Sequence, residues 1–215
     1  MISLNFVLII ILGGAFISYS DNVNCQLADS LIRFHVLANS DSLEDQTLKR
    51  EIRDKIIDFM KEELQESKDI EVTKYKINKN IEKIENIAKY KVMEHGKNYA
   101  VKAVLGKYLF PTKMYGDIVL PAGTYQALRI VIGEGEGSNW WCVLFPPLCF
   151  VDASHGIIPD YIKEDLRNVL SAENYNVITS RSYKSRIPIK MKFKSAEVIA
   201  SSKIKISRLL KKNIR

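Results

Sequence analysis

Two cysteines, Cys142 and Cys149, are the residues best suited to chemistry. A cysteine nucleophile needs a nearby base and a group that orients this base. His155 and Asp152 could fill these two roles, and His35 is a second candidate base. Such a set would indicate an exported cysteine-dependent hydrolase. The cysteines have large apolar neighbours, however, which is more typical of buried free thiols or of a disulfide.

Other chemistry in this region is limited to a disulfide and a weak cation site. Cys142 and Cys149 flank a Pro-Pro pair, and they can form a disulfide if their Cα atoms come within about 7 Å of each other. Glu134, Glu136 and Asn139 have a spacing that would suit calcium. The sequence has no close pair of zinc ligands, no phosphate loop, no dinucleotide fingerprint and no GxSxG elbow. We therefore expect no cofactor and no enzymatic activity.

The cysteines lie in an unusual stretch, Gly133–Phe150, that also holds both tryptophans. The segment Trp140–Phe145 predicts a buried strand, because it is apolar and rich in aromatic and β-branched residues. Neighbouring side chains of a strand point to opposite faces, so one tryptophan can pack inward while the other faces a partner. The Pro-Pro pair ends the strand. We expect five residues to form a partner contact: Trp140, Trp141, Phe145, Pro146 and Pro147.

Charge is distributed unevenly along the 215 residues of the chain. The sequence is 47% hydrophobic and 27% charged, which indicates a globular core rather than disorder. Its net charge of +7 combines a mildly acidic body with a basic tail, since residues 181–215 hold 12 Lys and Arg and a single acid. A basic tail beside an acidic body indicates an anionic partner, either a membrane surface or a nucleic acid.

The N-terminal segment decides between these two partners. Residues 6–17 form an apolar run of 12 residues, which is short for a membrane span and typical of the core of a signal peptide. Ser18 and Ser20 have the spacing of a cleavage site after Ser20; an uncleaved anchor and a buried helix are the alternatives. We therefore expect a secreted protein with no nucleic-acid partner, whose residues 181–215 contact an anionic membrane surface.

Helical and strand periodicities together predict an α+β fold. Alternating apolar residues predict a strand over Leu31–Ala38, and a cluster of cap residues at 39–42 begins a helix that runs to about Glu66. A second helical region covers Glu71–His95 and has a weak point near residues 76–80. Gly96 follows as a C-terminal cap.

After the second helical region the apolar residues recur with a period of two. Strands are predicted over residues 99–105, 117–120, 124–132 and 140–145, and their close spacing predicts an antiparallel meander. We expect an antiparallel sheet of about four to five strands packed against two N-terminal helices. Residues 160–172 predict a further amphipathic helix.

These patterns divide the chain into four parts. Residues 1–20 are a signal peptide or N-terminal anchor, and residues 21–30 are a linker. Residues 31–155 form the α+β domain. Residues 156–215 form a variable C-terminal extension that is first helical and then basic from residue 181.

Two stretches, together with the exported N terminus, resemble the stage II sporulation protein R family of endospore-forming bacteria. The stretches are Leu31–Asp54 and Phe110–Phe150, and the run NWWCVLFPPLCF makes the resemblance specific. The resemblance covers residues 30–152 and leaves out the basic tail.

The resemblance implies a secreted signalling protein that is made in the forespore and exported into the space between the two membranes. Such proteins activate a membrane-embedded aspartic protease of the mother cell, and this protease then cleaves the precursor of sigma-E. The resemblance implies no catalytic residues. Two other classes compete with it: an exported cysteine hydrolase of the envelope, and a wall-associated or membrane-associated structural protein held by its basic tail.

Overall fold

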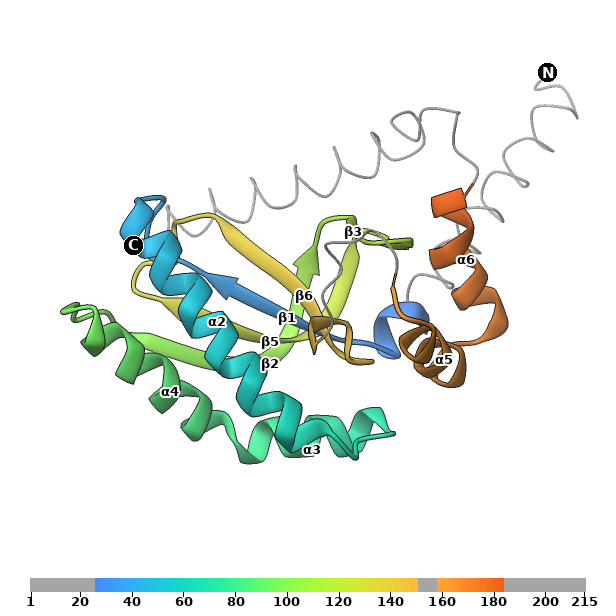
Figure 1. The fold of residues 1–215 in the computed structure, drawn as a ribbon, viewed down its shortest axis with the longest axis horizontal. Coiled ribbons are helices and arrows are strands. Elements are labelled where there is room, and N and C mark those ends of the chain that lie inside the picture. Colours follow the sequence, from blue (N-terminus) through green and yellow to red (C-terminus); the bar gives the residue numbers. More distant parts are fainter. Residues whose placement is uncertain (1–25, 151–157, 184–215) are drawn as a thin grey trace, which may run out of the picture.

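The predicted α+β class is confirmed by a computed structural model, which describes residues 26–150 and 158–183 (Figure 1). Its centre is a four-stranded sheet in the order β2-β5-β1-β6. The strands are β1 (Ile32–Leu37), β2 (Val101–Phe110), β5 (Gly123–Ile132) and β6 (Asn139–Phe145). One face of the sheet is covered by the helices α2 (Leu43–Leu64), α3 (Ile70–Lys79) and α4 (Ile81–Glu94).

The sheet is mixed, so the predicted antiparallel meander is wrong at one point. Strand β1 pairs in parallel with β5 and antiparallel with β6, while β2 and β5 are antiparallel. β1 therefore lies between β5 and β6, which follow one another in the sequence. The connecting residues 133–138 cross the end of β1 instead of closing a hairpin. As a central strand covered on both faces, β1 is buried at every position, including Arg33 and His35, for which the alternation predicted a polar face.

Several short elements cover the other face of the sheet. They are the hairpin of β3 (Lys113–Tyr115) and β4 (Ile118–Leu120), and the helices α5 (Asp160–Val169) and α6 (Ala172–Tyr183). The 3₁₀ turn η1 (Leu148–Phe150) follows β6 at the edge of the sheet and contacts α2. Helix α6 packs beside β4 (Figure 1). The predicted helix over residues 160–172 is confirmed in α5, whereas α6 and β3 were not expected from the sequence.

The sheet separates two apolar cores. The larger core lies between the sheet and helices α2 to α4 and holds Phe34, Ile52 and Ile84. The second core gathers Leu27, Ile162 and other residues on the opposite face. Residues 26–29 form a helical turn and Leu27 is fully buried, so the end of the predicted linker belongs to the body. Helices α5 and α6 also belong to the body, which therefore extends beyond residue 155.

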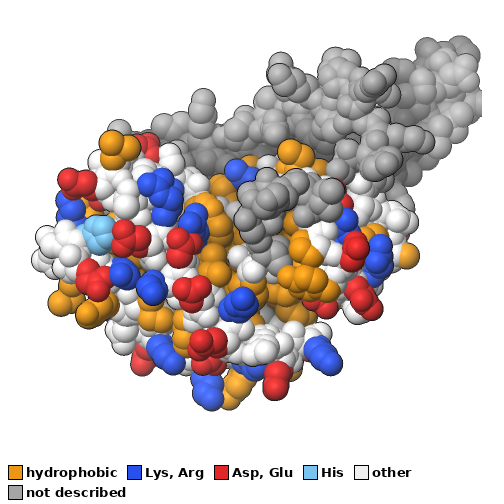
Figure 2. Space-filling model, in the orientation of Figure 1, with side chains coloured by type: hydrophobic (Ala, Val, Ile, Leu, Met, Phe, Trp, Pro, Cys, Tyr) orange, Lys and Arg blue, Asp and Glu red, His pale blue; other side chains and the backbone are white. Residues whose placement is uncertain are grey.

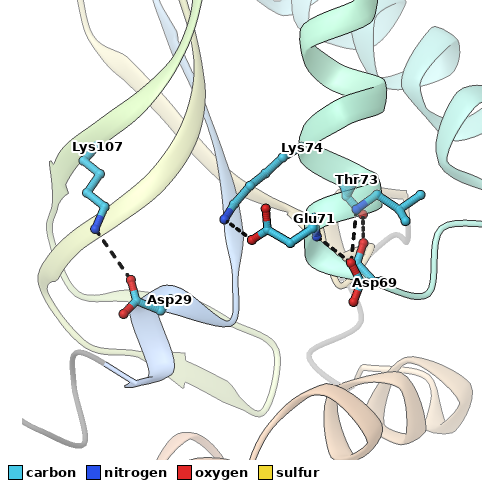
Figure 3. Close-up of polar contacts among 7 residues, drawn as sticks. Asp29, Asp69, Glu71, Thr73, Lys74 and Lys107 are labelled. Carbon is cyan, nitrogen blue, oxygen red and sulfur yellow. Dashed lines mark hydrogen bonds and ion pairs between the residues drawn. The ribbon is translucent and has the colours of Figure 1, made fainter.

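The helix ends follow the local sequence. Ser42 Oγ accepts a hydrogen bond of 3.1 Å from Asp45 N, within the predicted cap cluster. Asp69 caps α3 in the same way: its Oδ1 accepts hydrogen bonds of 2.7 and 3.1 Å from the backbone amides of Glu71 and Val72. Figure 3 shows the bond from Glu71. The predicted weak point becomes a break at Asn80, between α3 and α4. Gly96 ends α4 with a φ of 64°, which confirms the predicted cap.

The loop of residues 133–138 is bound tightly to the end of β1. Glu136 N and Gly137 N donate to the carbonyl oxygens of Asn39 and Ala38, at 3.2 and 3.0 Å. Gly133 has a φ of 57°, a conformation that favours glycine. The backbone donors of this loop are thus engaged inside the protein.

Replacing Gly137 with alanine should lower the free energy of unfolding by about 2 kcal/mol. A Cβ atom at this position would lie 2.2 Å from the carbonyl oxygen of Ser40, which is a backbone atom next to the α2 cap. Urea unfolding of the full chain measures the loss. Gly106→Ala is the matched control, because its Cβ would meet only the Tyr108 side chain, at 3.2 Å. Equal losses for the two variants would contradict the steric argument.

Candidate partner-binding site

The adjacent tryptophans of β6 lie on opposite faces of the sheet. The Trp140 ring meets the Phe34 ring edge-on at a centroid distance of 5.8 Å, and the Arg53 guanidinium of α2 lies 4.9 Å from the Trp140 centroid. On the other face, the Trp141 ring stacks on the His35 imidazole at 3.7 Å. Both tryptophans are half-buried, so each keeps surface that a partner can contact.

His35 is a buried, neutral side chain beside Trp141. It is 5% exposed, and its Nε2 lies 2.8 Å from Asn139 Oδ1. Burial lowers the pKa of His35 to about 4; the Asn139 hydrogen bond opposes this, and the charges of Arg129 and Arg33 add to it. An imidazole with such a pKa is a weak base for deprotonating a thiol near neutral pH. The geometry therefore favours a structural role for His35.

Cys142 and Cys149 are free thiols in this structure. Burial raises the pKa of the Cys149 thiol well above its ordinary value, and the neighbouring Cys142 raises it further. A protonated thiol is a poor nucleophile, which disfavours the cysteine hydrolase. His155 and Asp152 lie outside the described residues, and the disulfide between the two cysteines stays a prediction.

Arg33 holds β6 in place from beneath. Its side chain is fully buried, its Nε donates to the Cys142 carbonyl at 2.9 Å, and its second terminal nitrogen donates to the Tyr115 hydroxyl at 2.8 Å. The guanidinium lies 4.4 Å from the Phe110 ring centroid and 4.9 Å from that of Tyr125. Sequence reasoning missed this role, because an arginine in an alternating strand normally marks a solvent face.

The residues that end β6 line a groove. Phe145 and Pro146 are buried and Pro147 is half-buried, and the Phe145–Pro146 peptide bond is cis. The groove has a volume of about 1040 Å³, and its other described walls come from the C-terminal part of α2 and from α5. Apolar side chains line its floor: Leu144, Phe145, Pro146, Pro147, Phe150 and Val169. Figure 2 shows apolar side chains exposed among charged ones on this face of the molecule.

The charged residues around the groove are mainly acidic. Four acids and two lysines contribute to its lining: Asp58, Glu62, Glu164 and Asp165, with Lys61 and Lys68. Within the described ranges, no ion pair involves any of these four carboxylates. Burial and the charge of Glu164 raise the pKa of Asp165. The groove therefore combines an apolar floor with a charged rim in which acids outnumber lysines.

The structure divides the five predicted contact residues between separate surfaces. Phe145, Pro146 and Pro147 come together at the groove, whereas Trp140 and Trp141 are not part of its lining. Sequence reasoning missed the walls from α2 and α5. The α5 wall could have been suspected from the sequence, because the predicted amphipathic helix carries the adjacent acids Glu164 and Asp165. The partner contact itself stays a prediction.

The three candidate calcium ligands do not form a cation site in the described structure. Asn139 lies against His35, while Glu134 and Glu136 are exposed. Residues 26–150 and 158–183 contain no group of three or more His, Cys, Asp or Glu suited to a metal ion. In the same ranges, no helix has the length and apolar character needed to cross a membrane.

Comparison with known proteins relates the larger part of this chain to a family. The sequence profile described as stage II sporulation protein R matches residues 28–155. The chain belongs to the stage II sporulation protein R family. A relative from Bacillus subtilis (strain 168), the stage II sporulation protein R, is 44% identical over 137 residues. The aligned part covers 64% of this chain and 61% of the relative, and no solved structure matches.

Some of the residues that line the groove lie inside the family match and others lie outside it. The part of the chain that resembles stage II sporulation protein R includes β6, η1 and α2, which supply the floor and one wall. Helix α5, which supplies the wall with Glu164 and Asp165, lies beyond residue 155 and outside the match. Apart from Val169, the floor is therefore built from residues inside the family match, and the facing acidic wall is built from residues outside it.

Proposed function

We propose that this stage II sporulation protein is a secreted signalling protein of endospore formation. It activates a membrane-embedded aspartic protease of the mother cell, and the protease then processes the sigma-E precursor. The family match over residues 28–155, which includes β6 and η1, is the observation that carries the proposal. This reading agrees with the activity that the family resemblance implies.

The proposal places the protein outside the cytoplasm, between the forespore and mother-cell membranes. The apolar run at residues 6–17 supports export, although residues 1–25 lie outside the described part of the structure. The basic residues of 184–215 also lie outside it, and we propose that this tail contacts an anionic membrane surface. A membrane contact would hold the activator near its membrane-embedded partner.

In the proposed function the protein is a ligand of the protease and is not itself an enzyme. Burial raises the pKa of the Cys149 thiol, and the pKa of His35 near 4 makes this side chain a weak base. In the segment after β6, Leu148 N donates to the Pro146 carbonyl at 2.8 Å and Phe150 N to the Pro147 carbonyl at 3.3 Å, and these bonds preorganise its surface. A preorganised surface loses little entropy on binding, as an activating ligand requires.

Trp141→Ala should reduce precursor cleavage by about 30-fold while the protein remains folded, which corresponds to a lost contact of about 2 kcal/mol. Trp141 lies on the face that α2 to α4 do not cover, whereas Trp140 lies against Arg53 of α2. Co-expression with the candidate protease and the sigma-E precursor measures cleavage, and thermal melting measures folding.

Trp140→Ala is the packing control, with an expected stability loss of about 2 kcal/mol because its ring is half-buried against Phe34. Two variants that both melt low, or that both activate normally, would show that β6 is structural and that the contact lies elsewhere. Failure of the wild-type protein to promote cleavage would refute the proposed function as a whole.

A further inference from the structure

We infer that the groove between β6, α2 and α5 binds a cationic, apolar peptide segment of the partner protein. The inference rests on the proposed function and names the chemistry of the contacting segment. An apolar side chain of the partner packs on Phe145, Pro147 and Phe150, and Lys or Arg side chains beside it face the acids of the two walls.

The floor of the groove suits one or two large apolar side chains. The volume of about 1040 Å³ lies at the upper end of the size of ligand pockets, so it accommodates several residues of a peptide. Pro147 and Phe150 are only half-buried, and Tyr161 of α5 is 60% exposed at its edge. Burying these side chains against a partner removes apolar surface from water and stabilises the complex.

The walls of the groove select for positive charge. Asp58 and Glu62 are four residues apart on α2, so their carboxylates lie on one face of this helix. Glu164 and Asp165 face the groove from α5. Since none of these acids has an ion-pair partner among the described residues, a cationic segment supplies the missing charge. An acidic segment would be repelled by Glu164 and Asp165 of the α5 wall, whereas Lys61 and Lys68 oppose the two acids on the α2 side.

The first test measures peptide binding to the purified full chain by fluorescence anisotropy. The probe is a labelled peptide with a central Leu-Phe pair flanked by two lysines on each side, and a second probe has glutamates in place of the lysines. We expect the lysine probe to bind and the glutamate probe to bind at least about tenfold more weakly. Equal binding of the two probes, or no binding of either, would overturn the inference.

A charge-reversed variant then locates the binding site. Glu164→Lys with Asp165→Lys should weaken binding of the lysine probe by about tenfold or more. The matched control is Glu134→Lys with Glu136→Lys, which makes the same charge change at exposed residues outside the groove lining. An equal loss in both variants would mean that net charge alone attracts the probe, and this result would also overturn the inference.

The co-expression assay separates the inference from the function on which it rests. Suppose that the wild-type protein and the control variant promote cleavage of the sigma-E precursor and the groove variant does not. The proposed function and the inference about the groove are then both supported. If the groove variant is as active as the wild type, the inference fails and the proposed function remains. If the wild-type chain self-associates and the groove variant does not, the groove binds a second copy of the chain. This result would likewise overturn the inference.

Discussion

Replacing Arg33 with alanine should lower the free energy of unfolding by about 4 kcal/mol. The change removes a fully buried side chain, leaves a cavity among aromatic rings, and leaves the carbonyl oxygen of Cys142 without its donor. The desolvation of the guanidinium offsets part of this loss, since burying a charge is costly. Urea unfolding of the full chain measures the difference.

Two further substitutions separate the contributions of volume and hydrogen bonding at Arg33. Methionine fills most of the space but cannot donate, so Arg33→Met should cost about 2 kcal/mol. Lysine keeps the charge but lacks the planar fork that reaches both the Cys142 carbonyl and the Tyr115 hydroxyl, so Arg33→Lys should cost more than Arg33→Met. A methionine variant more stable than the wild type would show that the buried charge is a net cost, contrary to this prediction.

Acidification should destabilise the wild-type protein through His35. The pKa of His35 is about 4 in the folded protein and about 6.5 in the unfolded chain, so the unfolded chain takes up the proton first as the pH falls. The stabilisation is therefore complete above pH 6.5 and declines as the pH approaches about 4. The full shift corresponds to a loss of up to about 3 kcal/mol.

His35→Gln is the reference for this measurement, because glutamine cannot take up a proton in that range. Unfolding by urea is compared at several values between pH 6.5 and pH 4.5. Carboxylates with lowered pKa values, such as those of Asp45 and Asp117, lose their own stabilisation at lower pH and do so in both proteins. The difference between the two proteins should shrink as the pH falls, and parallel pH profiles would refute the assignment.

Both predictions concern the support of the proposed contact surface. Arg33 and His35 are neighbours on β1, and each bonds or stacks with a residue of β6. β6 is an edge strand of the sheet, and the groove begins where it ends. Loosening this support should therefore lower partner activation as well as stability.

Local features were predictable from the sequence, because they depend on residues close together in the chain. The cap cluster at residues 39–42 and the cap at Gly96 follow from backbone groups at helix ends, and the structure contains both. The strand Trp140–Phe145 was recognised from its apolar residues, and Pro146 ends it as expected. The family was also recognisable, because the run around the tryptophans is unusual in composition.

Features that join distant segments were decided only by the tertiary structure. The alternation of apolar residues indicates the faces of a strand but not its neighbours, so the insertion of β1 between β5 and β6 was not predictable. The same insertion buries Arg33 and His35, whose side chains would face water in an edge strand. The groove depends on α2 and α5, which are about 100 residues apart in sequence and pack on either side of the end of β6. Most of the helices and strands, the α+β class and the family were thus predictable from the sequence, while long-range pairing and burial set which side chains are hidden and which line the groove.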